Sequence, residues 1–470
     1  MFIGRKEELK ELKSKMNPNS AVLVYGLRRV GKTTFIKKAV EEIDKQAIYF
    51  ECIKASEEFN VKLFIELLVE QINFPNMVCS DFIFVFKFLN EHYKNYVFVL
   101  DEYSFLKEYY LSSKKSESHM DAERIDSEFK SIIDNYLTNN SLILCGSSIS
   151  IMKNLIVYNA PLYDRFVKVI HLKPLTYIEA NEFFADKSKK TTIEMYSIFG
   201  GSPNVLKSVD KNKSLKENVC ELPFSEEGKI IEHIRNNITA EFDKDPELNM
   251  ILNCLRQGSK KYSEIEDLCK FKTNGLMDKK IKKMLDLDII EKKYQIGVDN
   301  QKRKTYYSIK DNLLKFYYSY IYGNKNKISL LGPIRFYEQY VEPSVSTFIS
   351  HRFENIVKDY FALRIRKGAL NSVIDLGTYF SANNEFDCVL KNSDGTYDVY
   401  EVKYTIAPVK VSEIKKELAQ IDEIKGLKIG KVGFVSASGY EETLEEIDCL
   451  TIEDVFDVYL IIIFINIWAW

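Results

Sequence analysis

Residues 26–33 read GLRRVGKT, which fits the phosphate-binding pattern G-x-x-x-x-G-K-[ST]. Gly26 and Gly31 allow the backbone to fold so that consecutive N–H groups point at bound phosphates. Lys32 is expected to neutralise the β- and γ-phosphates, and the Thr33 hydroxyl to join the coordination shell of Mg²⁺. The loop therefore predicts an ATP site with magnesium, formed by Gly26, Leu27, Arg28, Arg29, Val30, Gly31, Lys32, Thr33 and Thr34.

An acidic pair follows a second apolar run, YVFVL at residues 96–100. A carboxylate at the carboxyl end of a parallel strand lies where ligands bind in open α/β sheets. Asp101 is therefore expected to hold magnesium through water, and Glu102 to polarise the attacking water as a general base. The alternative is an acidic pair that only faces solvent, but its position after the phosphate loop favours the catalytic interpretation.

A third apolar run, residues 141–146, ends in Ser147 and Ser148, which are candidates for contact with the γ-phosphate. Arg165, in the stretch APLYDRF, follows a short predicted helix and is a candidate arginine finger. A surface arginine in a salt bridge explains Arg165 equally well. An arginine finger that acts in trans would require a dimer or a ring, so a homo-oligomer is left open.

Two carboxylates and a lysine lie in a predicted hairpin in the last quarter of the chain. Asp387 falls in a strand predicted over 385–390, and Glu401 and Lys403 lie at the end of a strand predicted over 397–402. Because side chains alternate along a strand, Glu401 and Lys403 share a face, and the turn at 392–395 allows Asp387 to meet Glu401 across the pair. This order resembles the PD-(D/E)xK nuclease site, in which carboxylates hold magnesium and the lysine orients water.

Two more acidic residues are candidates for the same site. Glu354 lies in a helix predicted to open at residue 353 and to run to 366, and Asp375 lies in a strand predicted over 373–380. A further strand is predicted over 431–435. The competing interpretation is a nuclease-like scaffold without activity, whose E-V-K stretch is a half-exposed strand edge.

The elements that would position the phosphate loop alternate between strand and helix. Residues 21–25 predict a buried strand that leads into the loop, and residues 34–43 predict the helix after it. The runs at 96–100 and 141–146 predict two more strands of the same parallel sheet. The sequence therefore predicts an α/β fold around the nucleotide site.

Six motifs occur in the order typical of one known family. They are FIGR at 2–5, GLRRVGKTT from residue 26, LDE at 100–102, CGSS at 145–148, PLYDR at 161–165 and GGSP at 200–203. In these motifs the chain resembles archaeal-type AAA+-related P-loop ATPases, which often carry a C-terminal DUF234 domain. The resemblance implies a RecA-like core, a helical lid, a winged-helix segment and a nuclease-like C-terminal domain. It also implies that Ile3, Gly4 and Arg5 contact the nucleotide near the adenine, while Asp164 departs from the family's small or basic residue at that position.

The segment from about residue 246 to 309 predicts two short helices, over 263–269 and 274–287, and two strands, over 289–296 and 305–309. In the second helix an apolar stripe is made by Met277, Ile281, Met284 and Leu285. Four lysines lie largely off that stripe: Lys279, Lys280, Lys282 and Lys283. With the basic loop at 297–304, this order is typical of a winged helix that contacts DNA phosphates. A packing module whose lysines keep it in solution is the alternative.

Length and composition constrain the number of domains, the kind of DNA contact and the cellular setting. The chain has 470 residues and a formal net charge of −2, so any contact with DNA must come from a local basic patch. None of the eight cysteines forms a CxxC pair, and the N-terminus lacks an apolar signal segment, which favours a reduced, cytoplasmic setting without a membrane. The predicted division is a core at 1–170, a lid at 171–240, a winged helix at 241–325, a nuclease-like domain at 326–458 and an apolar tail at 459–470.

Together these features predict an ATP-binding and ATP-hydrolysing switch that acts on DNA. Two alternatives stay open. One is an ATP-dependent endonuclease that uses Asp387, Glu401 and Lys403. The other is a regulatory ATPase whose later domains bind only protein partners.

Overall fold

The computed structural model describes residues 2–43, 45–112, 118–225, 228–234, 245–270, 275–296, 305–380, 385–422, 424 and 426–457. These residues form two compact units. The first contains the residues up to Leu175 together with Ser202–Asn204, and the second contains Thr176–Gly201 and the residues from Val205 onward. The predicted apolar tail and the basic loop at 297–304 lie outside the described residues.

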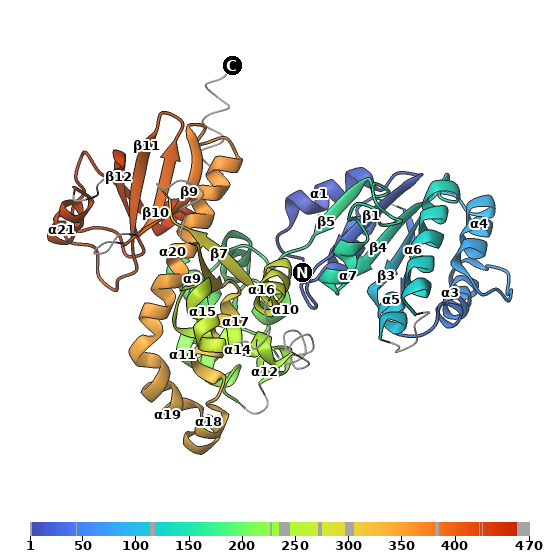
Figure 1. Cartoon of the computed structure of the whole chain (residues 1–470), viewed down its shortest axis with the longest axis horizontal. Helices are drawn as coiled ribbons and strands as arrows, with labels where there is room; N and C mark the ends of the chain where they lie inside the picture. The colour runs from blue at the N-terminus through green and yellow to red at the C-terminus, as the bar shows by residue number, and fades with distance from the viewer. Residues whose placement is uncertain are drawn as a thin grey trace. The chain divides into compact units, whose positions relative to one another are not determined.

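The first unit is built on a five-stranded parallel sheet with the order β2-β3-β4-β1-β5 (Figure 1). Its strands are β1 (Ser20–Tyr25), β2 (Gln46–Glu51), β3 (Tyr96–Asp101), β4 (Ser141–Gly146) and β5 (Lys168–His171). Every residue of β1 and β4 is buried, as expected for inner strands of a sheet that is covered on both faces. The prediction of a parallel α/β core is confirmed.

Helices cover both faces of this sheet (Figure 1). They are α1 (Lys6–Lys15), α2 (Lys32–Glu41), α3 (Glu57–Ile72), α4 (Phe82–His92), α5 (Ser104–Leu111), α6 (Ser118–Asn135) and α7 (Ile149–Asn154). On one face, Leu12 of α1 and Phe35 of α2 pack in a cluster with Val22 and Ile143 of the strands. On the other face, the Phe98 ring of β3 makes an edge-to-face contact with the Phe86 ring of α4. Buried apolar contacts on both faces therefore fix the carboxyl ends of β1, β3 and β4, where the predicted site residues lie.

The second unit begins with helices and a small sheet. Its elements up to residue 309 are α8 (Tyr177–Ala180), η1 (Asn181–Phe184), α9 (Lys189–Phe199), α11 (Leu215–Glu221), α12 (Lys229–Ile234), α14 (Pro246–Cys254), η3 (Leu255–Gln257), β6 (Lys260–Lys261), α15 (Tyr262–Cys269), α16 (Leu276–Asp286), β7 (Ile290–Tyr294) and β8 (Thr305–Ile309). The short helix α10 (Pro203–Leu206) begins in the first unit and ends in the second. The three strands form an antiparallel sheet in the order β6-β8-β7.

The C-terminal part of this unit is a five-stranded sheet in the order β13-β12-β11-β10-β9 (Figure 1). It contains β9 (Val373–Phe380), β10 (Glu385–Asn392), β11 (Thr396–Lys403), β12 (Lys428–Ser436) and β13 (Asp448–Thr451), with α21 (Val411–Asp422) and α22 (Ile452–Phe456). Ahead of the sheet come α17 (Asn312–Phe316), η5 (Tyr317–Ile321), α18 (Lys325–Leu331), α19 (Pro333–Phe336), η6 (Tyr337–Val341) and α20 (Glu342–Arg366). The Phe361 ring of α20 lies 4.5 Å from that of Tyr400 on β11, so α20 packs on the strands that carry the predicted carboxylates.

The prediction that a helix opens at residue 353 is wrong. Helix α20 begins at Glu342, and Pro343 occupies its first turn, where the missing N–H and the fixed φ of proline suit a helix start. Glu354 therefore lies in the middle of a long helix. Among the described residues, no helix is both long and apolar enough to cross a membrane.

Candidate functional site

The phosphate loop connects β1 to α2 through two glycines that other residues could not replace without strain. A Cβ atom added to Gly26 would lie 2.2 Å from the carbonyl oxygen of Leu172, and Gly31 has a left-handed φ of 94°. Because Gly31 stands at the N-cap of α2, no side chain there accepts the first amide hydrogens of the helix. The Lys32 ammonium is buried and donates to the carbonyl oxygens of Gly26 (3.1 Å) and Leu27 (3.2 Å), so it lies against the inside of the loop.

The end of β3 comes within hydrogen-bond distance of this loop. Strands β1 and β3 are separated by β4, yet the Thr33 hydroxyl donates to Asp101 Oδ2 at 2.5 Å. Asp101 is only 8% exposed, and its other carboxylate oxygen accepts the Glu102 amide at 2.9 Å. A hydroxyl and a carboxylate in contact beside a lysine form a donor set that suits Mg²⁺, which prefers oxygen ligands.

Glu102 and Ser147 are joined directly. Glu102 Oε2 accepts hydrogen bonds from the Ser147 amide (3.1 Å) and the Ser147 hydroxyl (2.6 Å). Glu102 also has a left-handed φ of 51°, which is uncommon for a residue with a side chain and is a feature of functional sites. Arg28 reaches the same serine, with Nε 3.4 Å from its hydroxyl oxygen, so the loop, β3 and β4 meet at Ser147. Ser148 lies next to it, at the N-cap of α7.

The N-terminal motif contacts the phosphate loop through Arg5. Arg5 is buried, and its guanidinium donates to the carbonyl oxygens of Val30 (2.8 Å) and Lys173 (2.9 Å). Ile3 and Gly4 precede Arg5 in the chain, and Gly4 is buried while Ile3 is half-buried. The GGSP motif also reaches this place, because the Ser202 hydroxyl donates to the Arg29 carbonyl oxygen at 3.4 Å. The sequence predicts no role for Ser202, although Ser202 belongs to GGSP, one of the six motifs of the family resemblance.

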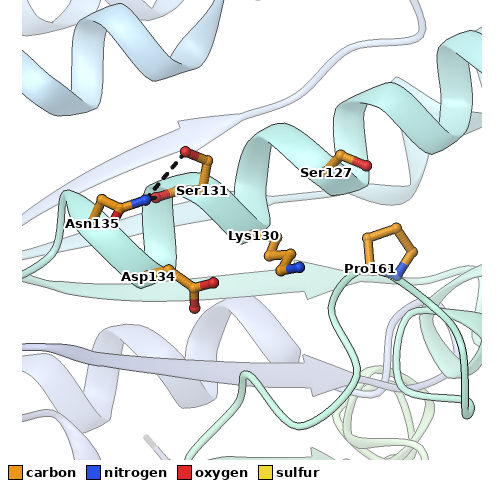
Figure 2. Close-up of a pocket in the computed structure, with 6 residues that line it drawn as sticks. All are labelled: Ser127, Lys130, Ser131, Asp134, Asn135 and Pro161. Carbon is orange, nitrogen blue, oxygen red and sulfur yellow. Dashed lines mark hydrogen bonds between the residues drawn. The ribbon is translucent and has the colours of Figure 1, made fainter.

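Arg165 lies in an ion pair on the surface of the first unit. Its Nε is 2.8 Å from Asp134 Oδ1, and its side chain is 33% exposed. Asp134 also lines a surface hollow of about 480 Å³, together with Ser127, Lys130, Ser131, Asn135 and Pro161. Figure 2 shows these six side chains. None of the residues predicted to contact nucleotide lines this hollow. In this arrangement Arg165 has the contact that the salt-bridge interpretation expects.

In the second unit, the hairpin of β10 and β11 brings the predicted carboxylates together. Cys388 pairs with Tyr400 in the antiparallel register, which places Asp387 and Glu401 opposite each other at the next position. Lys403 Nζ donates to Glu401 Oε1 at 3.0 Å, so the prediction that Glu401 and Lys403 share a face is confirmed. Lys403 also donates to Glu417 Oε1 of α21 at 2.8 Å. Sequence reasoning missed Glu417, because nothing in the spacing linked α21 to the hairpin.

Burial and mutual repulsion perturb these acids. Burial raises the pKa of Asp387 well above its ordinary value, and the charges of Glu354 and Glu401 raise it further. Burial also raises the pKa of Glu401 to about 7, although Lys403 opposes the shift. Burial acts in the same direction on Glu354, but its hydrogen bond with His351 and nearby cations lower its pKa overall. Such paired, perturbed carboxyls are typical of functional sites.

Three further observations bear on this cluster as a metal site. Glu401 Oε2 is buried and has no hydrogen-bond partner within the described structure. Asp375 lies opposite Lys391, further along β10 from Asp387, and its Oδ1 accepts the Leu376 amide. Across the described ranges, no three His, Cys, Asp or Glu side chains are grouped closely enough to hold a metal ion.

Helix α16 presents its lysines unevenly. Met277, Ile281 and Met284 are buried and Leu285 is half-buried, so the predicted apolar stripe faces the interior. Lys279 and Lys282 are exposed, whereas Lys280 forms an ion pair with Asp245 and lies 3.6 Å from Glu247. Only part of the predicted basic surface is therefore available to an outside partner.

Two protein families match this chain. Residues 2–209 match a family described as an ATPase domain predominantly from Archaea, and residues 317–417 match DUF234, described as archaeal and bacterial proteins of unknown function. Residues 2–209 therefore form an archaeal-type ATPase domain, and residues 317–417 form a DUF234 domain. A resemblance noticed in six short motifs is thus confirmed for both parts of the chain.

Relatives of this chain are found in Methanocaldococcus jannaschii. An uncharacterized protein of that organism is 25% identical over 96% of this chain and 98% of its own length. An uncharacterized ATP-binding protein is 56% identical over 43 residues, which are 9% of this chain and 73% of that protein. Among solved structures, the Walker-type ATPase of Pyrococcus abyssi is 18% identical, covers 67% of this chain and 96% of its own, and has a TM-score of 0.49. The ORC2 protein of Aeropyrum pernix, in complexes with ADPNP and ADP, is 12% identical over 69% and 94%, with a TM-score of 0.44.

Proposed function

We propose that this ATPase binds Mg-ATP along residues 26–34 and couples its hydrolysis to DNA contact by the second unit. The observation that carries the nucleotide site is the 2.5 Å contact between Thr33 Oγ1 and Asp101 Oδ2, which joins the phosphate loop to the acidic end of β3. Magnesium, when bound, would neutralise phosphate oxygens, and Thr33 and Asp101 are the side chains that would hold it.

The surrounding residues then take distinct roles. The amides at the start of α2 and the Lys32 ammonium bind phosphate oxygens, since both present positive charge to the interior of the loop. Glu102 accepts the proton of the attacking water and is held in place by Ser147. Arg5 positions the loop through the Val30 carbonyl, so we assign it a positioning role beside any contact with the base. Arg165 acts on nucleotide only after its ion pair with Asp134 opens.

We further propose that α16 and the small sheet beside it form a winged helix that binds DNA phosphates. The supporting observation is that Lys279 and Lys282 project from the exposed side of a helix whose other side is buried on Met277 and Ile281. Lysines placed in this way attract the phosphate backbone without reading base sequence.

Salt dependence of DNA binding tests this proposal. A double variant with Lys279→Ala and Lys282→Ala should bind duplex DNA about tenfold more weakly in low salt, and the slope of log affinity against log salt should fall by about 2. The matched control is Lys415→Ala with Lys416→Ala, which removes the same charge from two exposed positions on α21. Equal losses in both variants, or a parent affinity that salt does not change, would leave protein partners as the better interpretation.

The carboxylate cluster supports a second candidate, a hydrolytic centre for nucleic acid. It is favoured by the facing carboxyls of Asp387 and Glu401 with Lys403 beside them. Because the described residues offer no group of three ligands, two carboxylates and solvent would have to hold magnesium there. If this candidate is right, the parent nicks supercoiled plasmid with Mg²⁺ and ATP, and Asp387→Ala does not. Equal nicking by both proteins would point to a contaminating nuclease and remove the candidate.

A further inference from the structure

Two cysteines of the second unit meet at the ends of neighbouring helices. Cys254 is the last residue of α14 and Cys269 is the last residue of α15. Their sulfur atoms are 3.4 Å apart, within hydrogen-bond distance for thiols. All eight cysteines of the chain lie in the described residues and are free thiols.

The two thiols differ in their access to solvent. Cys269 is only 3% exposed, whereas Cys254 is partly exposed. Burial, with the hydrogen bond to Cys254, raises the pKa of Cys269 to about 12. An external reagent therefore meets Cys254 first, and Cys269 is placed behind it as the thiol that resolves a mixed disulfide.

The geometry favours a disulfide over a metal site. A sulfur–sulfur bond is roughly 2.05 Å long, so the two atoms must approach by roughly 1.3 Å, a distance that small side-chain rotations cover. A thiolate metal site commonly has four ligands, and the described residues contain no group of three His, Cys, Asp or Glu side chains that could supply the others.

We propose that Cys254 and Cys269 form a reversible disulfide by exchange with a low-molecular-weight aliphatic disulfide. The Cys254 thiolate attacks one sulfur of that disulfide, forms a mixed disulfide and expels one thiolate. The Cys269 thiolate then attacks the Cys254 sulfur and expels the second thiolate. In total, the two protein thiols lose two electrons and two protons. The small disulfide takes up these electrons and protons and is reduced to two thiols.

The bond would tie the carboxyl end of α14 to that of α15, and α15 comes before the lysine-bearing α16 in the chain. It would close a loop of about 15 residues, which restricts the unfolded chain and stabilises this segment. Both thiols stand at helix carboxyl ends, where the partial negative charge disfavours a thiolate. The pair should therefore oxidise slowly at neutral pH and faster as pH rises. This inference does not rest on the proposed function.

The test is oxidation of the full chain with oxidised glutathione at pH 8, followed by alkylation of the remaining thiols under denaturing conditions and peptide mass mapping. The expected product has lost two of its eight free thiols and the mass of two hydrogen atoms, contains one Cys254–Cys269 cross-link and is restored by a reducing agent. In Cys269→Ser, Cys254 should instead carry glutathione as a stable mixed disulfide.

Two single variants serve as controls, because Cys79 and Cys449 are also partly exposed. Cys79→Ser and Cys449→Ser should form the Cys254–Cys269 cross-link to the same extent as the parent. The proposal is overturned if the parent keeps all its thiols, if glutathione remains on Cys254 in the parent, or if a different pair of cysteines is cross-linked.

Discussion

Glu102 combines an unusual backbone conformation with the carboxylate that we propose as the general base. Its left-handed φ turns the chain sharply at the end of β3, and its carboxylate is then held by both the amide and the hydroxyl of Ser147. Strain of this kind persists only where the surrounding structure holds it, which here is the fully buried end of β4. The pair fixes the position of the proposed general base.

Two substitutions separate binding from turnover at this site. Glu102→Gln keeps the side-chain oxygen that Ser147 contacts but removes the basic carboxylate, so Mg-ATP should still bind while hydrolysis falls by about 100-fold or more. Lys32→Ala should weaken Mg-ATP binding itself, because it removes the cation inside the loop. Calorimetry and phosphate release measure the two effects. Unchanged turnover in Glu102→Gln would exclude Glu102 as the base.

At the scale of elements, the strands of the core could be predicted because their own composition determines them. Runs such as AVLVY and SLILCG are apolar throughout, and both became strands buried along their whole length. The start of α20 could not be predicted in this way. Residues 342–347 are exposed or half-buried and contain no apolar run, and the buried side of the helix begins only at Phe348. Pro343 in the first turn is the local signal for this start.

In the candidate sites too, some features can be predicted from local sequence, whereas others depend on contacts between elements that are distant in the chain. The phosphate loop and Asp101 followed from motif and strand order alone. The contacts of Arg5 with Lys173 and of Lys403 with Glu417 join residues from separate elements, and no spacing in the sequence encodes them. Tertiary packing decides such contacts.

The α20 helix and the β10–β11 hairpin together bury Glu401 and create a dependence of stability on pH. Its pKa rises from the ordinary 4.5 to about 7, so between these values the folded protein binds a proton that the unfolded chain releases. Stability therefore falls as pH rises through this window, by on the order of 1–3 kcal/mol. Glu401→Gln should melt with a smaller decrease in Tm from pH 5 to pH 8 than the parent.

The control for this measurement is Glu442→Gln, which removes an exposed carboxylate from the same unit. Its Tm should follow the parent across the whole range. Asp387 acts in the same direction as Glu401, so the slope in Glu401→Gln should be reduced and not abolished. A parent Tm that does not change between pH 5 and pH 8 would show that neither acid is buried as described.

At the scale of the whole molecule, the proposed ATP site belongs to one unit and the exposed lysines of α16 belong to the other. The net charge of −2 gives no general attraction for DNA, so any affinity must come from a local basic patch, such as the exposed lysines of α16. If nucleotide controls that affinity, the two sites must be coupled by a free energy that acts equally in both directions.

This reciprocity gives a prediction for the proposed switch. In Glu102→Gln, which should hold Mg-ATP without turnover, duplex DNA affinity should change by about 5-fold or more when Mg-ATP is added. Mg-ATP affinity must then change by the same factor when DNA is added, because linkage requires it. Fluorescence anisotropy of labelled DNA and calorimetry of Mg-ATP measure the two factors. If DNA binds with the same affinity with and without Mg-ATP, the lysines of α16 serve a DNA contact that the ATPase does not control, and the switch must act on another partner.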